Sequence, residues 1–317
     1  MSPHTTDLLI DNQDVPTPTR LEVRDPGRLQ DVVGLLAQGS VADVDRAVQS
    51  AQRAFASWRH TDPAERAALL MQAAALLDEL APQVAELMAR ESGMLVPINR
   101  GEVGMAAHIV RDNAELAPAF LAPRQLADAT SWVSVEKRPI GVIAAIASWN
   151  APVILTMRKL APALACGNTL VIKPSPAAPL GISLLLKRIA ALFPPGVVNV
   201  VHGGAEVGHA LSTHPLVRKV SFTGGGAVAR TIMKDAADSL KGVQFELGGN
   251  DPAIVLDDAD FADAVPKIVG GAFRRAGQFC FAVKRVYVPA ARFDEFFDAM
   301  RAEVDKFQVG HPLEAGT

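Results

Sequence analysis

The stretch IGVIAAIA, residues Ile140 to Ala147, decides the fold class because it is an almost unbroken apolar run of strand length. A continuous run of this kind predicts a strand covered on both faces, as in a parallel sheet that lies between helices. It ends in Ser148-Trp149-Asn150, and ligands of open α/β sheets lie beyond the carboxyl ends of the strands. We therefore expect an α/β fold in which Asn150 faces a ligand, although an asparagine after a strand is also a common turn residue.

The same strand-then-helix pattern repeats after this run. Helices are predicted at 155–165 and 180–193, and strands at 169–172, 197–201 and 219–222. Lys173 stands at the end of one of these strands, and Thr223-Gly224-Gly225 opens a helix that runs towards 237. Glycines at a helix start let a phosphate group reach backbone N–H groups, but a glycine cluster alone is weak evidence. The repeated pattern predicts a Rossmann-like, three-layer parallel-sheet domain.

The residues before this domain core are expected to serve packing. Residues 1–38 contain short extended pieces, with a turn at Asp25-Pro26-Gly27. Ser40 and Asp43 form a capping pattern for a helix that ends near Trp58, and a second helix starts at Pro63, continues past Pro82 and ends near Glu91. An extended hairpin is expected between 121 and 138, where a plain surface hairpin is an equally good interpretation.

Two short motifs towards the C-terminal end carry residues suited to catalysis. The first is FELGGN, Phe245 to Asn250, in which Glu246 ends an apolar run; the second is GQFC, Gly277 to Cys280. A thiolate is a strong nucleophile, and a cysteine on a glycine-containing turn after a helix at 261–276 can be exposed. Taken alone, Cys280 could be a small buried hydrophobe and Glu246 a solvated strand end.

The two motifs together resemble the aldehyde dehydrogenase superfamily, over residues from about Ala42 to the last residue. The resemblance implies the fold of that family: a dinucleotide-binding domain at 1–119 and 140–248, an oligomerisation hairpin at 120–139, and part of a second α/β catalytic domain at 249–317. It also implies a small-molecule aldehyde as substrate, NAD or NADP as cofactor, and a homo-oligomer, dimer or tetramer, for the full-length protein.

The resemblance also assigns roles to residues of this chain. It implies that Cys280 attacks the aldehyde carbon, that Asn150 and the backbone N–H of Cys280 hold the oxyanion, and that Glu246 activates water to hydrolyse the thioester to a carboxylic acid. The implied cofactor-binding residues are Ser148, Trp149, Lys173, Ser175, Gly203, Gly208, Thr223, Gly224, Gly225, Val228, Leu247 and Gly248.

Three positions depart from the family pattern. Pro176 stands where a carboxylate often meets the ribose hydroxyls, so we expect NADP to be accepted at least comparably with NAD. Gly225 and Ala229 replace a serine and a glycine in the phosphate-binding segment. Phe281 is bulkier than the small or aliphatic residue that usually follows the nucleophile, which favours a narrowed or aromatic-lined pocket.

The resemblance also implies a longer chain, which continues with an E-x-F-G-P motif whose glutamate holds the nicotinamide ribose. The 317 residues are accordingly expected to be a naturally short product or part of a longer protein. Two other functions stay open: a dinucleotide-binding but catalytically impaired fragment, and a thioester or ester hydrolase that uses the same cysteine. The final helix is expected at 293–307, with an apolar stripe formed by Phe296, Phe297, Met300, Val304 and Phe307.

Composition narrows the classes of partner. The net charge of −3 gives no electrostatic reason for binding nucleic acid or an anionic membrane. Two cysteines make no disulfide framework, which favours the cytoplasm, and Cys166 is expected to be structural. The N-terminus lacks a signal-peptide pattern, and polar residues interrupt the longest apolar stretch. The seven histidines are scattered without ligand spacing, so no metal site is predicted.

Overall fold

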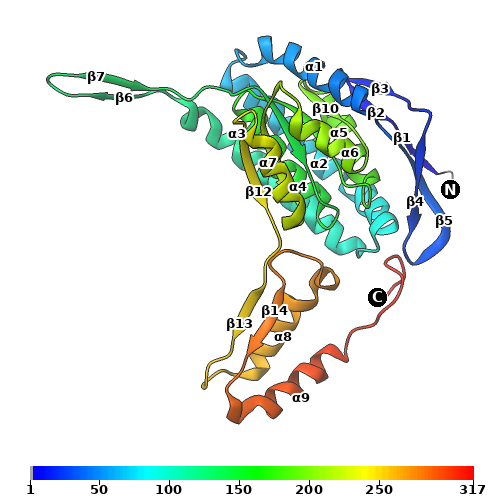
Figure 1. The fold of residues 1–317 in the computed structure, drawn as a ribbon. Coiled ribbons are helices and arrows are strands. Elements are labelled where there is room, and N and C mark those ends of the chain that lie inside the picture. Colours follow the sequence, from blue (N-terminus) through cyan, green and yellow to red (C-terminus); the bar gives the residue numbers. More distant parts are fainter. Residues whose placement is uncertain (1–2) are drawn as a thin grey trace.

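The structure is a computed structural model that describes residues 3–317; residues 1 and 2 of the predicted N-terminal segment lie outside this range. A large body holds a central sheet between two layers of helices, and a smaller lobe hangs below it (Figure 1). The predicted α/β class with a three-layer parallel sheet is confirmed.

The central sheet of the body has seven strands in the order β12-β11-β8-β9-β10-β2-β3. The first five are parallel, and β2 joins the edge of β10 in antiparallel orientation. The parallel strands are β8 (Val142–Ile146), β9 (Thr169–Lys173), β10 (Val198–Val200), β11 (Val217–Thr223) and β12 (Gly242–Glu246), and the antiparallel pair is β2 (Leu8–Ile10) and β3 (Gln13–Val15).

Helices cover both faces of this sheet, which explains why β8 is apolar throughout. Ile143 and Ala145 pack into the core beneath α2 to α5, whereas Val142, Ala144 and Ile146 point to the core beneath α1, α6 and α7. The first layer consists of α2 (Pro63–Ser92), α3 (Val96–Leu121), α4 (Pro152–Ala165) and α5 (Leu180–Ala190), and the second of α1 (Val41–Trp58), α6 (Ala205–Thr213) and α7 (Gly226–Ala237).

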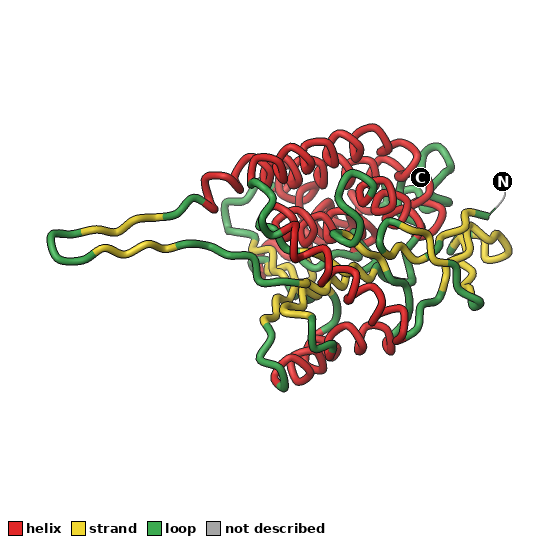
Figure 2. The backbone as a smooth tube through the Cα atoms, turned by 90° about the horizontal axis from the view of Figure 1, so that it is seen from above, coloured by secondary structure: helices red, strands yellow, loops and turns green. Residues whose placement is uncertain are grey.

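Two smaller β structures flank the body. A three-stranded sheet in the order β1-β5-β4 lies beside it and comprises β1 (His4–Thr6), β4 (Arg20–Asp25) and β5 (Arg28–Ala37). A hairpin of β6 (Arg124–Ala127) and β7 (Trp132–Val135) projects far from the rest of the molecule (Figure 2). The predicted turn at Asp25-Pro26-Gly27 and the predicted extended hairpin are both present.

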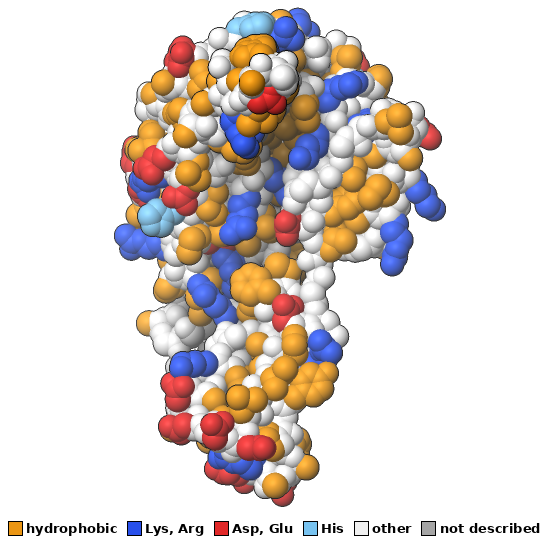
Figure 3. Space-filling view, turned by 90° about the vertical axis from the view of Figure 1, so that its left-hand side faces the viewer, with side chains coloured by type: hydrophobic (Ala, Val, Ile, Leu, Met, Phe, Trp, Pro, Cys, Tyr) orange, Lys and Arg blue, Asp and Glu red, His pale blue; other side chains and the backbone are white. Residues whose placement is uncertain are grey.

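The small lobe packs two helices on a two-stranded parallel sheet. Its core consists of Val255, Phe261, Val265, Val269 and Phe296, while several other apolar side chains remain on its surface (Figure 3). Its elements are β13 (Asp251–Ile254), α8 (Phe261–Phe273), the 3-10 turn η1 (Arg274–Gly277), β14 (Val283–Tyr287), the 3-10 turn η2 (Ala290–Arg292) and α9 (Phe293–Val304).

Most predicted elements are present, but several boundaries were wrong. Helix α4 begins at Pro152 rather than 155, because proline fits the first turn of a helix. Helix α5 ends at Ala190 rather than 193, and α8 ends at Phe273 rather than 276 because the chain turns there into left-handed backbone. The helices α3 and α6 were not predicted.

Candidate active site

The order of the central strands defines where a ligand can bind. From β8 the chain proceeds to β9 and β10 on one side, and then returns to place β11 and β12 on the other side. The carboxyl ends of β8 and β11 therefore form the topological switch point, where ligands of open α/β sheets lie. Asn150 follows β8, and the segment Thr223-Gly224-Gly225 follows β11.

Asn150 is half-buried and its amide is held in one orientation. Its Oδ1 accepts a hydrogen bond from Ser148 Oγ at 2.8 Å, and its Nδ2 donates to the backbone oxygen of Gln278 at 3.0 Å. An amide nitrogen carries two hydrogens, so one N–H is used to orient the group and the second remains as a donor. The contact with Gln278 brings Asn150 to the loop that carries Cys280.

A buried ion pair lies behind Asn150. Glu102 on α3 accepts hydrogen bonds from the backbone N–H groups of Val153 and Ile154, at 2.8 and 3.2 Å, and so caps the start of α4. Arg275 pairs with the same carboxylate and also donates to the backbone oxygen of Asn150. Burial raises the pKa of Glu102, and the charge of Arg275 and these hydrogen bonds oppose that rise.

Glu246 ends β12 and is exposed, as a group that works on water requires. In the parallel ladder it lies opposite Thr223 of β11, and its Oε1 accepts from Gln244 Nε2 at 3.0 Å. Lys159 on α4 donates to Thr223 Oγ1 at 2.7 Å. Burial lowers the pKa of Lys159 to about 8, and the nearby Glu246 opposes this shift.

Cys280 is exposed, so the interpretation as a buried hydrophobe was wrong. Its backbone oxygen accepts from Gly249 N at 3.1 Å and from Lys284 Nζ at 2.9 Å. A Cβ at Gly249 would lie only 2.7 Å from that oxygen, so the close approach requires glycine. The glutamate motif and the cysteine motif, well separated in the sequence, are thus joined directly by a backbone hydrogen bond.

The predicted cofactor-binding residues lie at the carboxyl ends of the parallel strands or in the helices that follow. Lys173 ends β9 and is buried without a carboxylate partner among the described residues, and burial lowers its pKa to about 8. Gly208 on α6 lies against its side chain, because a Cβ there would be 3.8 Å from Lys173 Cε. The others lie at the ends of five strands or in the first turn of α7: Ser148, Trp149, Ser175, Gly203, Thr223, Gly224, Gly225, Val228, Leu247 and Gly248.

Sequence reasoning did not assign roles to Glu102, Lys159 and Arg275. A signal existed for two of them. Glu102 lies in the buried stripe of α3 between Asn99 and Val103, and Lys159 lies in a helix made mostly of apolar residues. A charged residue at a buried helical position is rare unless it has a partner. Periodicity could therefore have marked both, but not the partner of either.

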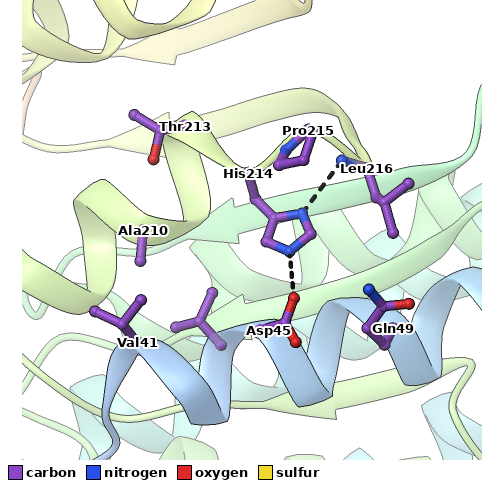
Figure 4. A pocket seen from close by; sticks show the side chains of 9 residues that line it. Val41, Asp45, Gln49, Ala210, Thr213, His214, Pro215 and Leu216 are labelled. Carbon is purple, nitrogen blue, oxygen red and sulfur yellow. Dashed lines mark hydrogen bonds and ion pairs between the residues drawn. The ribbon is translucent and has the colours of Figure 1, made fainter.

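A pocket of the body lies away from these residues, between α1, α6 and the start of β11 (Figure 4). His214 contributes its ring, with Nε2 3.2 Å from Asp45 Oδ1 and Nδ1 accepting from Leu216 N at 3.2 Å. The pocket lies at the amino end of β11, whereas Thr223 lies at the carboxyl end. It contains none of the predicted site residues.

Residues 3–317, the described part of the chain, contain no group of three or more His, Cys, Asp or Glu side chains that could hold a metal ion. None of the helices in this range combines the length and the hydropathy needed to cross a membrane.

Comparison with known proteins identifies the family. A profile described as the aldehyde dehydrogenase family matches residues 14–317. This chain belongs to the aldehyde dehydrogenase family. It is similar to succinate-semialdehyde dehydrogenase [NADP(+)] of Escherichia coli, at 38% identity over 90% of this chain and 60% of the relative. It is also similar to glutarate-semialdehyde dehydrogenase of Pseudomonas putida, at 38% identity with the same coverage.

Solved structures superpose closely on the chain. An NADP-dependent enzyme of E. coli has a TM-score of 0.95 at 34% identity, covering 99% of this chain and 66% of that one. Aldehyde dehydrogenase C of Pseudomonas syringae, a mutant complexed with NAD+ and octanal, has a TM-score of 0.92 at 37% identity, covering 98% and 64%. The chain spans about 60% of the length of the curated relatives it matches.

Proposed function

We propose that this chain forms the dinucleotide-binding part and the nucleophile-bearing part of an enzyme that oxidises an aldehyde to a carboxylic acid with NAD or NADP. The observation that carries the proposal is the meeting of three groups from distant segments. Asn150 contacts the Cys280 loop through Gln278, and the Glu246 motif contacts the backbone of Cys280 through Gly249. A nucleophile, an oxyanion donor and a base are the groups that acyl chemistry on a thiol requires.

The residues act in sequence. The Cys280 thiolate attacks the carbonyl carbon, and the carbonyl π electrons move to oxygen, giving a thiohemiacetal whose oxyanion accepts from Asn150 Nδ2 and the backbone N–H of Cys280. A bound nicotinamide would supply the acceptor for the hydride of that carbon, which would leave a thioester on Cys280. Glu246 takes a proton from water, which attacks the thioester, and the thiolate leaves as the carboxylic acid forms.

The residues at the strand ends fit a dinucleotide. Gly225 and Gly226 open α7, and a Cβ at either would meet no atom within 4 Å, so backbone N–H groups at this helix start are open to a phosphate. Lys173 has no carboxylate partner within residues 3–317, so its buried ammonium group can bind a ribose hydroxyl or a phosphate. The carboxylate that would repel a 2′-phosphate is replaced by Pro176, which supports use of NADP as well as NAD.

The same proposal includes the division of the chain. Residues 1–119 and 140–248 form the dinucleotide-binding domain and residues 249–317 part of the catalytic domain. The hairpin at 120–139 joins copies of the protein into a dimer or tetramer. Support for the last point comes from exposed apolar side chains along the hairpin, including Leu126, Trp132 and Val133. Apolar side chains clustered on a projecting element are typical of a protein interface.

The proposed nucleophile is tested by Cys280→Ala. The variant should lose at least about a hundredfold in aldehyde-dependent reduction of NAD or NADP, since it has no nucleophile, and should keep dinucleotide affinity within a few-fold. Cys166→Ala is the matched control, because that cysteine lies at the end of α4 away from the site, and should keep the wild-type rate. Retention of more than a few per cent of the rate by Cys280→Ala would contradict the assignment.

The proposed base is tested by Glu246→Gln. This variant should form the thioester but hydrolyse it slowly, so intact-protein mass spectrometry should detect an acyl group on Cys280. Turnover of an ester or thioester without any aldehyde-dependent reduction of NAD or NADP would favour a hydrolase instead. Binding without turnover in any assay would favour a catalytically impaired fragment.

A further inference from the structure

We propose that the Glu102–Arg275 ion pair is a positioning device that sets the geometry between Asn150 and the Cys280 loop. The proposal rests on the proposed function, because it concerns how that site is held in shape. Arg275 and Glu102 come from different parts of the fold: Glu102 lies within α3 of the body, and Arg275 lies in η1, the turn between α8 and the nucleophile. The side chain of Arg275 is 10% exposed and that of Glu102 is 2% exposed.

The backbone at Arg275 does not hold its shape unaided. Three successive residues have positive φ: Arg275 at 53°, Ala276 at 53° and Gly277 at 73°. Only the glycine adopts such angles without strain, so the two other residues need an external tether. The buried pair with Glu102 supplies that tether, and it fixes the point at which the chain leaves α8 and turns towards Cys280.

The same pair also fixes the other side of the site. Glu102 holds the first turn of α4 through the N–H groups of Val153 and Ile154, just after Asn150. Arg275 donates to the backbone oxygen of Asn150, and Asn150 Nδ2 donates back to the oxygen of Gln278. One carboxylate and one guanidinium group thus connect the segment that bears the oxyanion donor to the segment that bears the nucleophile.

The role is one of positioning, since both charged groups are already engaged within the protein. The Arg275 guanidinium forms an ion pair with Glu102 and a hydrogen bond with the backbone oxygen of Asn150. Glu102 is almost fully buried. Loss of the pair should therefore affect steps that need the oxyanion donor more than steps that need only the thiolate. Small misplacements of reacting groups have large effects on rate.

Two reactions of the intact 317-residue chain separate these effects. With p-nitrophenyl acetate, the Cys280 thiolate attacks the carbonyl carbon through an oxyanion, p-nitrophenolate leaves, and an acetyl thioester forms. With iodoacetamide, the same thiolate displaces iodide, and no oxyanion arises. Neither reaction needs a dinucleotide or an oxidant. The acylation burst is the rapid first release of p-nitrophenolate, and its rate depends on both the Cys280 thiolate and the oxyanion donor. The alkylation rate depends on the thiolate alone.

We expect Arg275→Met and Glu102→Gln to slow the acylation burst by roughly 10- to 100-fold, below the full loss of an oxyanion donor, and to leave alkylation within about three-fold. Arg275→Lys keeps the charge and should recover part of the burst. Matched controls are Arg274→Met, whose exposed side chain has no ion pair within residues 3–317, and Glu115→Gln on the exposed face of α3. Both should leave the two rates unchanged.

A double-mutant cycle with Asn150→Ala tests whether Arg275 acts through Asn150. If it does, adding Arg275→Met to Asn150→Ala should slow the burst far less than it does in the wild type. Additive losses, an unchanged burst in Arg275→Met, or equal losses in both reactions would overturn the proposal. If Arg275→Met fails to fold, as judged by circular dichroism, Arg275→Lys and Glu102→Gln decide by the same criteria. A wild-type chain that is alkylated at Cys280 but shows no burst would instead contradict the proposed function.

Discussion

Ala276 is a non-glycine residue in the left-handed region of backbone conformation, where a Cβ causes strain. Its φ of 53° brings the Cβ close to the following carbonyl oxygen, a strain worth roughly 1–2 kcal/mol for a residue other than glycine. Ala276→Gly should therefore raise the free energy of unfolding by about 1 kcal/mol in urea denaturation. Ala68→Gly, at an exposed position inside α2, should lower it by about 1 kcal/mol. Destabilisation by both variants would show that the left-handed turn is not the native conformation.

Lys173 should make stability depend on pH on the alkaline side. Burial lowers its pKa to about 8 from the ordinary value of 10.5, so the unfolded chain binds its proton more tightly than the folded protein does. Stability should then rise as the pH increases from about 8 to 10.5 and level off above that range. Lys173→Met should stabilise the protein at pH 7 and reduce this slope in denaturation curves. Lys234→Met, at an exposed position of α7, should leave the slope unchanged.

For single residues, the sequence reveals those that belong to a short motif. It does not reveal which distant residue each side chain contacts. Glu246 and Cys280 could be found because the residues around each form a local pattern. The contact between Arg275 and Glu102 could not be found, because 173 positions separate the two residues. Neither residue type nor periodicity says which buried charge meets which, since that depends on how α3 and the small lobe are placed in space.

Helix α9 shows which features of a helix its hydrophobic periodicity can predict. A stripe of five apolar residues was predicted, but only Phe296 is deeply buried, 5.3 Å from Phe261 between ring centroids. Met300 and Val304 pack partly against the same core, whereas Phe297 and Phe307 are exposed. Phe297 and Phe307 remain exposed because the small lobe buries only one narrow face of the helix, and α9 ends at Val304 rather than at the predicted residue 307.

The contrast between neighbouring phenylalanines gives a direct test. Phe296→Ala should cost about 3–5 kcal/mol of stability in the small lobe, because it removes a buried ring from a tight cluster. Phe297→Ala, 56% exposed in the same helix, should change stability by less than about 0.5 kcal/mol. Thermal or urea unfolding of the two variants makes the measurement. Similar losses in both would mean that the outer face of α9 is also packed in solution.

At the scale of the whole molecule, the chain returns from α9 to the N-terminal β4–β5 hairpin (Figure 1). His311 Nε2 lies 2.9 Å from Asp25 Oδ2, with both side chains buried, and Arg28 pairs with Glu314 at 2.8 Å on the surface. The sequence predicted the turn at Asp25 and the helix before this tail, but not their contact. A contact between segments 286 positions apart follows from the packing of the whole fold.

The two contacts of the C-terminal segment after α9, His311 with Asp25 and Glu314 with Arg28, should differ in strength. His311→Ala leaves the buried Asp25 carboxylate without this partner and should speed trypsin cleavage at Lys306 by several-fold, because the tail opens more often. Glu314→Gln removes only an exposed pair and should leave cleavage nearly unchanged. Equal cleavage rates in wild type and His311→Ala would show that the histidine does not secure the tail.

The register of the edge strand β12 determines where insertions and deletions near this strand can be tolerated. Thr223 lies opposite Glu246, and Lys219 lies opposite Gly242. Alternate residues of a strand point to opposite faces, so loss of one residue within β12 would turn the Glu246 carboxylate to the other side of the sheet. The segment just before it differs, because Leu240 is 92% exposed on a turn. Insertions and deletions among homologous sequences should therefore accumulate at 238–241 and be absent from the five residues that follow.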